Sequence, residues 1–220
     1  MNLAEHRAAL RLDLNDPAGA AQRFADADLT RAITRAVSEL TLAHPRLTDT
    51  EVVLASATRT IPLPALTFPN LIDVEEIEHP YGAAGIASTV PPTLPPFLLA
   101  PDRASALLLT ADVPAAGSRL RLRWTGPHQI AEATTTVPAE LDYMLSRGAY
   151  GFACLAYSTP AADNFRYEDG ATVATVDDSM IPTAWRIRAN EALAEFRESL
   201  TLLRLRRTLS VTTTWPLEAA

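Results

Sequence analysis

Apolar residues recur at steps of four, four and three along one stretch of the chain, at Leu29, Ile33, Val37 and Leu40. This spacing places them on one face of an α-helix. We expect Asp26 to be the N-cap, because its carboxylate can accept a backbone N–H of the first turn. Pro45 cannot continue the helix and disfavours helical backbone at His44, so the helix should end there.

Three more segments show helical spacing. The first covers Leu3–Leu14, with its larger apolar residues on one side. The second opens at Pro138, a residue suited to the first helical turn, and its stripe includes a glycine. Each glycine costs a lone helix up to about 1 kcal/mol, which is tolerated where another helix must approach closely. The stripe consists of Leu141, Leu145, Gly148, Phe152 and Leu155.

The last predicted helix is long and follows a polar stretch from Thr159 to Val176. Asp177, Asp178 and Ser179 offer caps for it, and Pro182 falls in its first turn. Its apolar face comprises Ala189, Leu193, Phe196, Leu200 and Leu203.

The middle of the chain has a different pattern. Most of the 17 prolines lie there, and paired prolines exclude helix. Along Arg119–Trp124 the residues alternate strictly, which predicts a strand with Leu120, Leu122 and Trp124 buried and three arginines on the other face. The other candidate strands are residues 51–54, 71–78, 97–99 and 106–109.

Together these patterns predict an α+β protein: a four-helix bundle, two helices from each end of the chain, with a small β-sheet domain inserted between them. The bundle would take residues 1–48 and 138–209, and the inserted domain residues 49–137. Residues 210–220 would form a C-terminal tail.

The formal net charge is −7, and a chain this acidic is unlike proteins that clamp nucleic acid by releasing counterions from its phosphates. The single Cys154 lies in an apolar helical stretch, which excludes a disulfide framework and favours an inert core thiol. The N-terminus does not resemble a signal peptide, and no apolar stretch is long enough to span a membrane. We expect a soluble, intracellular product.

No pattern of catalytic or metal-binding residues emerges. His6, His44, His79 and His128 are scattered and lack metal-ligand spacing, so we expect them to be solvent-exposed or to cap helices. The glycine-containing segment 82–85 is better interpreted as a turn than as a phosphate-binding loop, and capping explains Asp177 and Asp178 better than acid–base chemistry. We therefore expect neither an enzyme nor a bound metal or cofactor.

Two features of the C-terminal region have two interpretations each. Three arginines crowd the end of the last helix, where they could meet the negative end of the helix dipole or an acidic partner. Trp215 lies in a tail with no visible core, so it either packs back locally or anchors the tail in another chain. The candidate partner-binding residues are Arg204, Arg206, Arg207, Trp215 and Leu217.

Several stretches resemble the head–tail connector proteins of tailed bacteriophages, also called adaptor or head-completion proteins. In that family a short helix with an acidic end, an aromatic-x-Asp cap and an amphipathic second helix open a helical bundle. Residues 11–16, 23–33, 36–40 and His44-Pro45 resemble this opening, and 145–153 followed by a long terminal helix resemble its second half. The β insert is larger than the hairpin of the smaller members.

The resemblance implies a non-enzymatic virion protein of the neck, present in the host cytoplasm during assembly. It would form a ring below the portal, as a dodecamer, extend the DNA channel without sequence-specific DNA binding, and offer a surface to a stopper or tail protein. Of the two interpretations of the tail given above, our hypothesis is that it docks on the portal. Two alternatives remain: a tail-completion or minor tail protein, and a small enzyme using His79, Tyr81 and His128.

Overall fold

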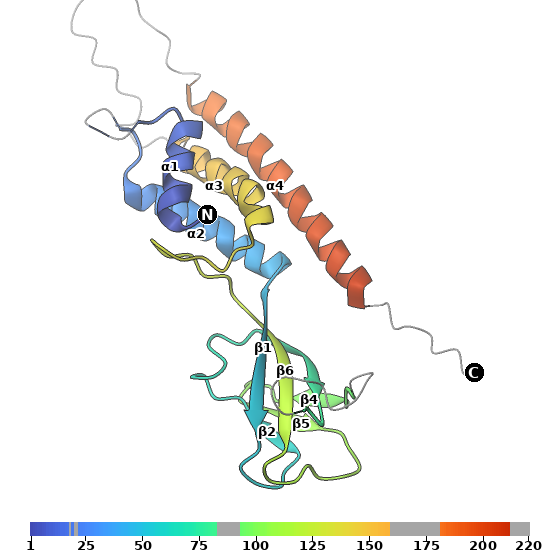
Figure 1. Cartoon of the computed structure of the whole chain (residues 1–220). Coiled ribbons are helices and arrows are strands. Elements are labelled where there is room, and N and C mark those ends of the chain that lie inside the picture. The colour runs from blue at the N-terminus through green and yellow to red at the C-terminus, as the bar shows by residue number, and fades with distance from the viewer. Residues whose placement is uncertain (18, 20–21, 83–92, 159–180, 212–220) are drawn as a thin grey trace, which may run out of the picture. The chain divides into compact units, whose positions relative to one another are not determined.

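The computed structural model describes residues 1–17, 19, 22–82, 93–158 and 181–211, with the side chains of the last segment described from Pro182 to Arg206. The chain divides into two compact units (Figure 1). Unit 1 joins Met1–His44 to His128–Ala220, and unit 2 is Pro45–Pro127. Four helices that pack together and two small antiparallel sheets confirm the α+β prediction.

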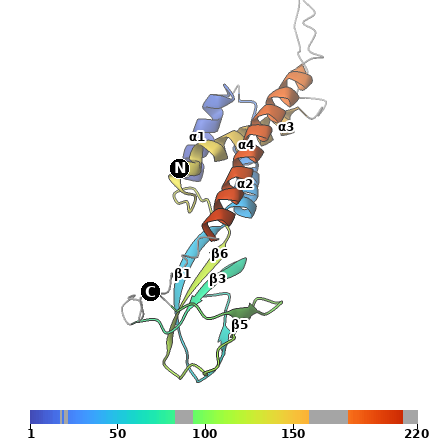
Figure 2. The same ribbon diagram turned by 90° about the vertical axis from the view of Figure 1, so that its right-hand side faces the viewer.

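Among its described residues, unit 1 contains four helices and a short 3-10 turn, η2, that leads into α3. In two views at right angles, α4 runs alongside α3 (Figures 1 and 2). The elements are α1 (Leu3–Asp13), α2 (Asp26–Ala43), η2 (Ala139–Leu141), α3 (Asp142–Tyr157) and α4 (Ile181–Val211).

The predicted stripe of α2 is buried, with Leu29, Ile33 and Leu40 fully inaccessible to solvent, and the helix ends at Ala43 with His44 as its C-cap, as the proline predicts. The predicted N-cap is wrong. The capping position is Ala25, whose methyl side chain cannot form a capping hydrogen bond, and Asp26 is the first helical residue. Asp26 instead accepts a hydrogen bond from Arg11, so an ion pair with another helix replaced the local cap.

The glycines of α3 allow a close approach to α4, as the sequence predicts. A Cβ atom added to Gly148 would lie 2.9 Å from two ring carbons of Phe196. One added to Gly151 would lie 2.7 Å from Leu193 Cγ. Both distances are shorter than carbon–carbon contacts at optimal separation, about 3.5–4.0 Å. The predicted apolar face of α4 is buried from Ala189 to Leu200 and packs on this surface.

The described part of unit 2 holds two three-stranded antiparallel sheets, in the region where the sequence predicts a small β-sheet domain. Their strand orders are β1-β6-β3 and β2-β5-β4, and one core of buried side chains includes residues from both sheets. The strands are β1 (Arg46–Val53), β2 (Thr60–Pro62), β3 (Asp73–Glu78), β4 (Phe97–Leu99), β5 (Ser105–Leu108) and β6 (Arg119–Gly126).

The central strand β6 has the faces that its alternation predicts. Leu120, Leu122 and Trp124 lie in the core, whereas the arginines lie on the other face. Trp124 is 2% exposed and its Nε1–H donates to Thr50 Oγ1, while the side chain of Arg121 is 28% exposed. A strand shifted by one residue would have reversed these values.

Residues 128–137, grouped with the strands from the sequence, contact helical residues in the structure. The backbone N–H of Leu3 donates to the carbonyl of Ala131, and that of His128 donates to Thr41 Oγ1 on α2. Within the described part of the chain, no helix is long and apolar enough to cross a membrane. The expected turn after Gly82, the caps Asp177, Asp178 and Ser179, and the tail residues Trp215 and Leu217 lie outside the described residues.

Candidate functional site

The predicted partner-binding arginines lie on the second half of α4. Arg204 and Arg206 are exposed, and the side chain of Arg207 is outside the described set. The helix continues to Val211, so none of the three arginines falls in its last turn. The dipole interpretation is therefore wrong, because the dipole's influence is confined to about the last turn of a helix. A role in contacting a partner remains open to test.

A groove of about 410 Å³ in unit 1 is lined in part by Arg204. Its rim comes from the end of α2 and from α4, and it combines aliphatic carbon with two guanidinium groups. Leu42, at this rim, is 76% exposed, and Leu202 and Leu205 are also exposed on α4. The groove is lined by Glu39, Leu42, Arg197, Leu200, Thr201 and Arg204.

Such a surface suits a protein partner that offers apolar and acidic side chains. The sequence analysis missed Leu42, which lies outside the apolar stripe of α2. The sequence shows only that Leu42 is an apolar residue outside this stripe. The structure shows that it lines a groove together with residues of α4.

Arg11 forms a polar joint between α1 and α2. Its guanidinium donates to the Asp16 carboxylate at 2.8 Å, to the Asp26 carboxylate at 2.7 Å and to the Phe24 carbonyl at 3.0 Å. Asp16 is buried and also accepts the backbone N–H groups of Arg23 and Phe24. The hydrogen bond from Arg11 lowers the pKa of Asp26. The joint fixes how the first two helices meet.

His6 lies between a serine and an aspartate in a catalytic-triad-like arrangement. Its Nδ1 is 3.3 Å from Ser146 Oγ, and its Nε2 is 3.4 Å from Asp142 Oδ1. The ring is 1% exposed, and burial lowers the pKa of His6. Asp142 also binds the N-terminal ammonium group of Met1. Neither of the two cavities described below and above is lined by these residues, and the cluster ties α1 to α3.

The expectation that the histidines are exposed or cap helices is right for His44 but wrong for His6 and His128, which are buried. The ring of His128 lies between two carbonyl oxygens, that of His44 at 2.9 Å and that of Thr136 at 3.0 Å. The ring of His128 thus links His44, where the chain leaves unit 1, to the segment where the chain re-enters it. His79 and Tyr81 belong to unit 2, and Tyr81 packs its ring against Arg121.

The arginine face of β6 is neutralised by its neighbours. Arg119 pairs with Glu51, Arg121 with the buried Glu78, and Arg123 with both Asp49 and Glu76. All three arginines thus have acidic partners on the flanking strands. This face is unsuited to binding phosphates.

Cys154 is buried among the helices, and burial raises the pKa of its thiol to about 11. A thiol that stays protonated is a poor nucleophile and metal ligand, which agrees with the predicted inert role. The described residues contain no cluster of three or more His, Cys, Asp or Glu side chains that could hold a metal ion.

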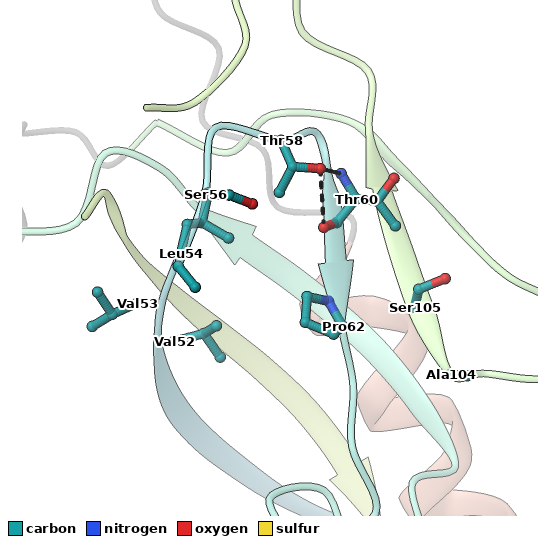
Figure 3. Close-up of a pocket in the computed structure, with 10 residues that line it drawn as sticks. Val52, Val53, Leu54, Ser56, Thr58, Thr60, Pro62, Ala104 and Ser105 are labelled. Carbon is teal, nitrogen blue, oxygen red and sulfur yellow. Dashed lines mark hydrogen bonds between the residues drawn. The ribbon is translucent and has the colours of Figure 1, made fainter. Parts of the chain in front are cut away.

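Unit 2 has an open cavity of about 480 Å³ between the end of β1 and strands β2 and β5 (Figure 3). Its lining has hydroxyl and aliphatic groups but no ionisable side chain. The cavity therefore has room for a small ligand, but its lining offers no acid, base or thiol for catalysis. The lining residues are Val52, Val53, Leu54, Ala55, Ser56, Thr58, Thr60, Pro62, Ala104 and Ser105.

No protein-family model matches the sequence, and no curated protein matches it. The solved structures that are similar include two from gene transfer agent particles. One is the neck of an empty gene transfer agent particle computed with C6 symmetry: 19% identity, TM-score 0.31, covering 84% of this chain and 88% of that chain. The other is the virion of a native gene transfer agent particle, with 18% sequence identity and a TM-score of 0.28. That match covers 84% of this chain and 89% of the chain in the virion. These values do not establish a shared fold.

Proposed function

We propose that this chain is a structural protein of a phage-like neck: a head–tail connector that forms a dodecameric ring below the portal. The ring would extend the DNA channel and present a surface to a stopper or tail protein. It would enclose DNA without binding particular sequences, and it would need no metal or cofactor.

The joint at Arg11 carries this proposal. The sequence resemblance to connector proteins depends on a short helix with an acidic end, an aromatic-x-Asp element and an amphipathic second helix. Here Asp16, Phe24 and Asp26 converge on the single guanidinium of Arg11. The residues that carry the resemblance therefore build one connected structural element.

A structural role also agrees with how the chemically capable groups of the described chain are used. His6 and His128 lie buried in packing contacts, and Cys154 has a raised pKa. The arginines of β6 are paired with carboxylates, which suits a channel through which DNA slides without adhering.

We further propose that the end of α4 and the tail after it contact the portal. The contacting residues would be Arg204, Arg206 and Arg207 with Trp215 and Leu217. The groove beside Leu42 adds exposed apolar area next to Arg204. Such contacts can be weak individually, because a symmetric portal raises the effective concentration of neighbouring copies.

Co-sedimentation of the purified chain with the portal of its own particle tests this. Arg206→Glu and deletion of residues 212–220 should each abolish co-sedimentation while leaving the circular dichroism spectrum unchanged. Arg186→Glu is the matched control, since Arg186 is an exposed arginine nearer the start of the same helix. Binding that survives both changes would refute the assigned surface, and failure of the unaltered chain to bind would refute the connector role.

A further inference from the structure

The two sheets of unit 2 have four edge strands: β1 and β3 in one sheet, β2 and β4 in the other. Edge strands present unpaired backbone groups to other chains, and proteins usually blunt them. Strand β2 is blunted in two ways. Pro62 has no N–H, and the N–H of Thr60 donates to Thr58 Oγ1.

Strands β3 and β4 are also blunted. The ladder between β3 and β6 is interrupted by a register shift between Val74 and Glu76, and the N–H of His79 just after β3 donates to the carbonyl of Thr93. Strand β4 is three residues long and follows Pro95 and Pro96.

Strand β1 has none of these devices. It is eight residues long, contains neither proline nor glycine, and pairs with β6 without a register shift. At its end the N–H of Leu54 donates to Ser118, so the alternate residues of β1 direct their backbone groups away from β6. Within the described residues, no hydrogen-bond partner appears for the outward N–H groups of Leu47, Asp49, Glu51 and Val53.

The side chains of these four residues indicate what could pair with the edge. Leu47 and Val53, 55% and 56% exposed, flank Asp49 and Glu51. Val53 also lines the open cavity at the end of β1 (Figure 3). A strand added here would meet apolar surface at both ends and two carboxylates between.

A second copy of this strand is a poor match. Antiparallel self-pairing centred on Thr50 would set Leu47 opposite Val53, but it would also set Asp49 opposite Glu51 twice. Like charges placed directly opposite each other destabilise a sheet. The acidic pair therefore disfavours self-association. Both carboxylates already pair with arginines of β6, Glu51 with Arg119 and Asp49 with Arg123, so a basic strand on the other side of β1 would continue the alternation of acidic and basic strands across this face.

We propose that the free edge of β1 is the docking site for an extended segment of a different protein, by β-strand addition. The segment carries basic residues at alternate positions, opposite Asp49 and Glu51, between apolar residues opposite Leu47 and Val53. The site lies within a single copy of the chain, so this proposal can be tested whether or not the chain forms a connector ring.

A peptide with the sequence of residues 118–126 is a suitable probe, because in β6 Arg123 lies opposite Asp49 and Arg121 opposite Glu51. We expect saturable binding to the full chain, and slower hydrogen exchange at the amides of Leu47, Asp49, Glu51 and Val53 when the peptide is bound. The control peptide is N-methylated at the backbone nitrogens of Arg121 and Arg123, which keeps every charge but removes the two N–H groups that would face Glu51 and Asp49 of β1.

Variants of Val53 separate the backbone from the side chain. Val53→Pro removes one outward N–H and leaves the ladder to β6 intact, so it should weaken peptide binding about tenfold. Val53→Thr keeps the N–H and should bind nearly as the unaltered chain does. The exchange pattern of the unaltered protein decides the question even if Val53→Pro does not fold.

Several results would overturn the proposal: no binding of the peptide, equal binding of the N-methylated control, or slowed exchange at amides other than these four. Protection of the same four amides in the free chain that increases with protein concentration would show that a second copy occupies the edge, and would also overturn it.

Discussion

Replacing Gly151 of α3 with alanine should destabilise unit 1 even though alanine is the better helix former. In an open helix this change would stabilise by up to about 1 kcal/mol. Here the new Cβ would lie 2.7 Å from Leu193 Cγ, 2.9 Å from Leu193 Cδ2 and 3.2 Å from the Leu193 backbone nitrogen.

Relieving these contacts requires Leu193 or the backbone of α4 to move by about 1 Å, since optimal carbon–carbon separation is about 3.5–4.0 Å. Overpacking of this kind costs about 1–3 kcal/mol, so the net loss should be up to about 2 kcal/mol once a propensity gain of about 1 kcal/mol is subtracted. Urea unfolding followed by the helical circular dichroism signal measures this loss in unit 1.

The matched control is Ala156→Gly, at an exposed position of the same helix, which should destabilise by up to about 1 kcal/mol through propensity alone. In the background of Leu193→Ala, which removes the two closest atoms, Gly151→Ala should lose most of its cost. A urea midpoint that rises on Gly151→Ala in the otherwise unaltered chain would refute close helix packing at this glycine.

Three further predictions follow from buried groups of unit 1. Arg11→Met leaves the Asp16 carboxylate buried without its cation and should lower the free energy of unfolding in urea by about 3–5 kcal/mol. The control Arg31→Met breaks an exposed pair with Asp28 and should lower it by less than about 0.5 kcal/mol. Equal losses would contradict a structural role for the ion pairs of Arg11. Because burial lowers the pKa of His6, the unfolded chain binds more protons than the folded chain below about pH 6.5. The free energy of unfolding should therefore fall as the pH drops through that value, and His6→Gln should make this fall smaller. An identical pH profile for the variant would contradict a contribution from His6. The Cys154 thiol should resist a thiol reagent at pH 8 until urea unfolds unit 1, whereas fast labelling of the folded chain would show an accessible thiolate.

Periodicity was sufficient to predict the helices and the faces of β6, because these features are set by residues close in sequence. The apolar stripe of α2 and the alternation of Arg119–Trp124 each encode their own burial. The small residues of α3 likewise predicted a close neighbour without identifying the atoms of Phe196 and Leu193 that lie there.

Features that depend on distant partners could not be predicted. Asp26 resembles an N-cap locally, but Arg11 of another helix binds it. His6 appeared isolated because Ser146 and Asp142, which surround it, come from α3.

Two strands also escaped the pattern. The start of β1 was missed because its inward positions are Arg46, Thr48 and Thr50, which give no apolar alternation. Strand β2 was missed because it is only three residues long and ends in Pro62.

The central claim is that the chain forms a ring below a portal, and electron microscopy of the purified chain mixed with the portal of its own particle tests it most directly. The account predicts added ring-shaped density, coaxial with the portal and on the side that faces the tail, made of symmetric copies of this chain. Portal particles with no added density, or density from this chain at the distal end of a tail, would contradict it.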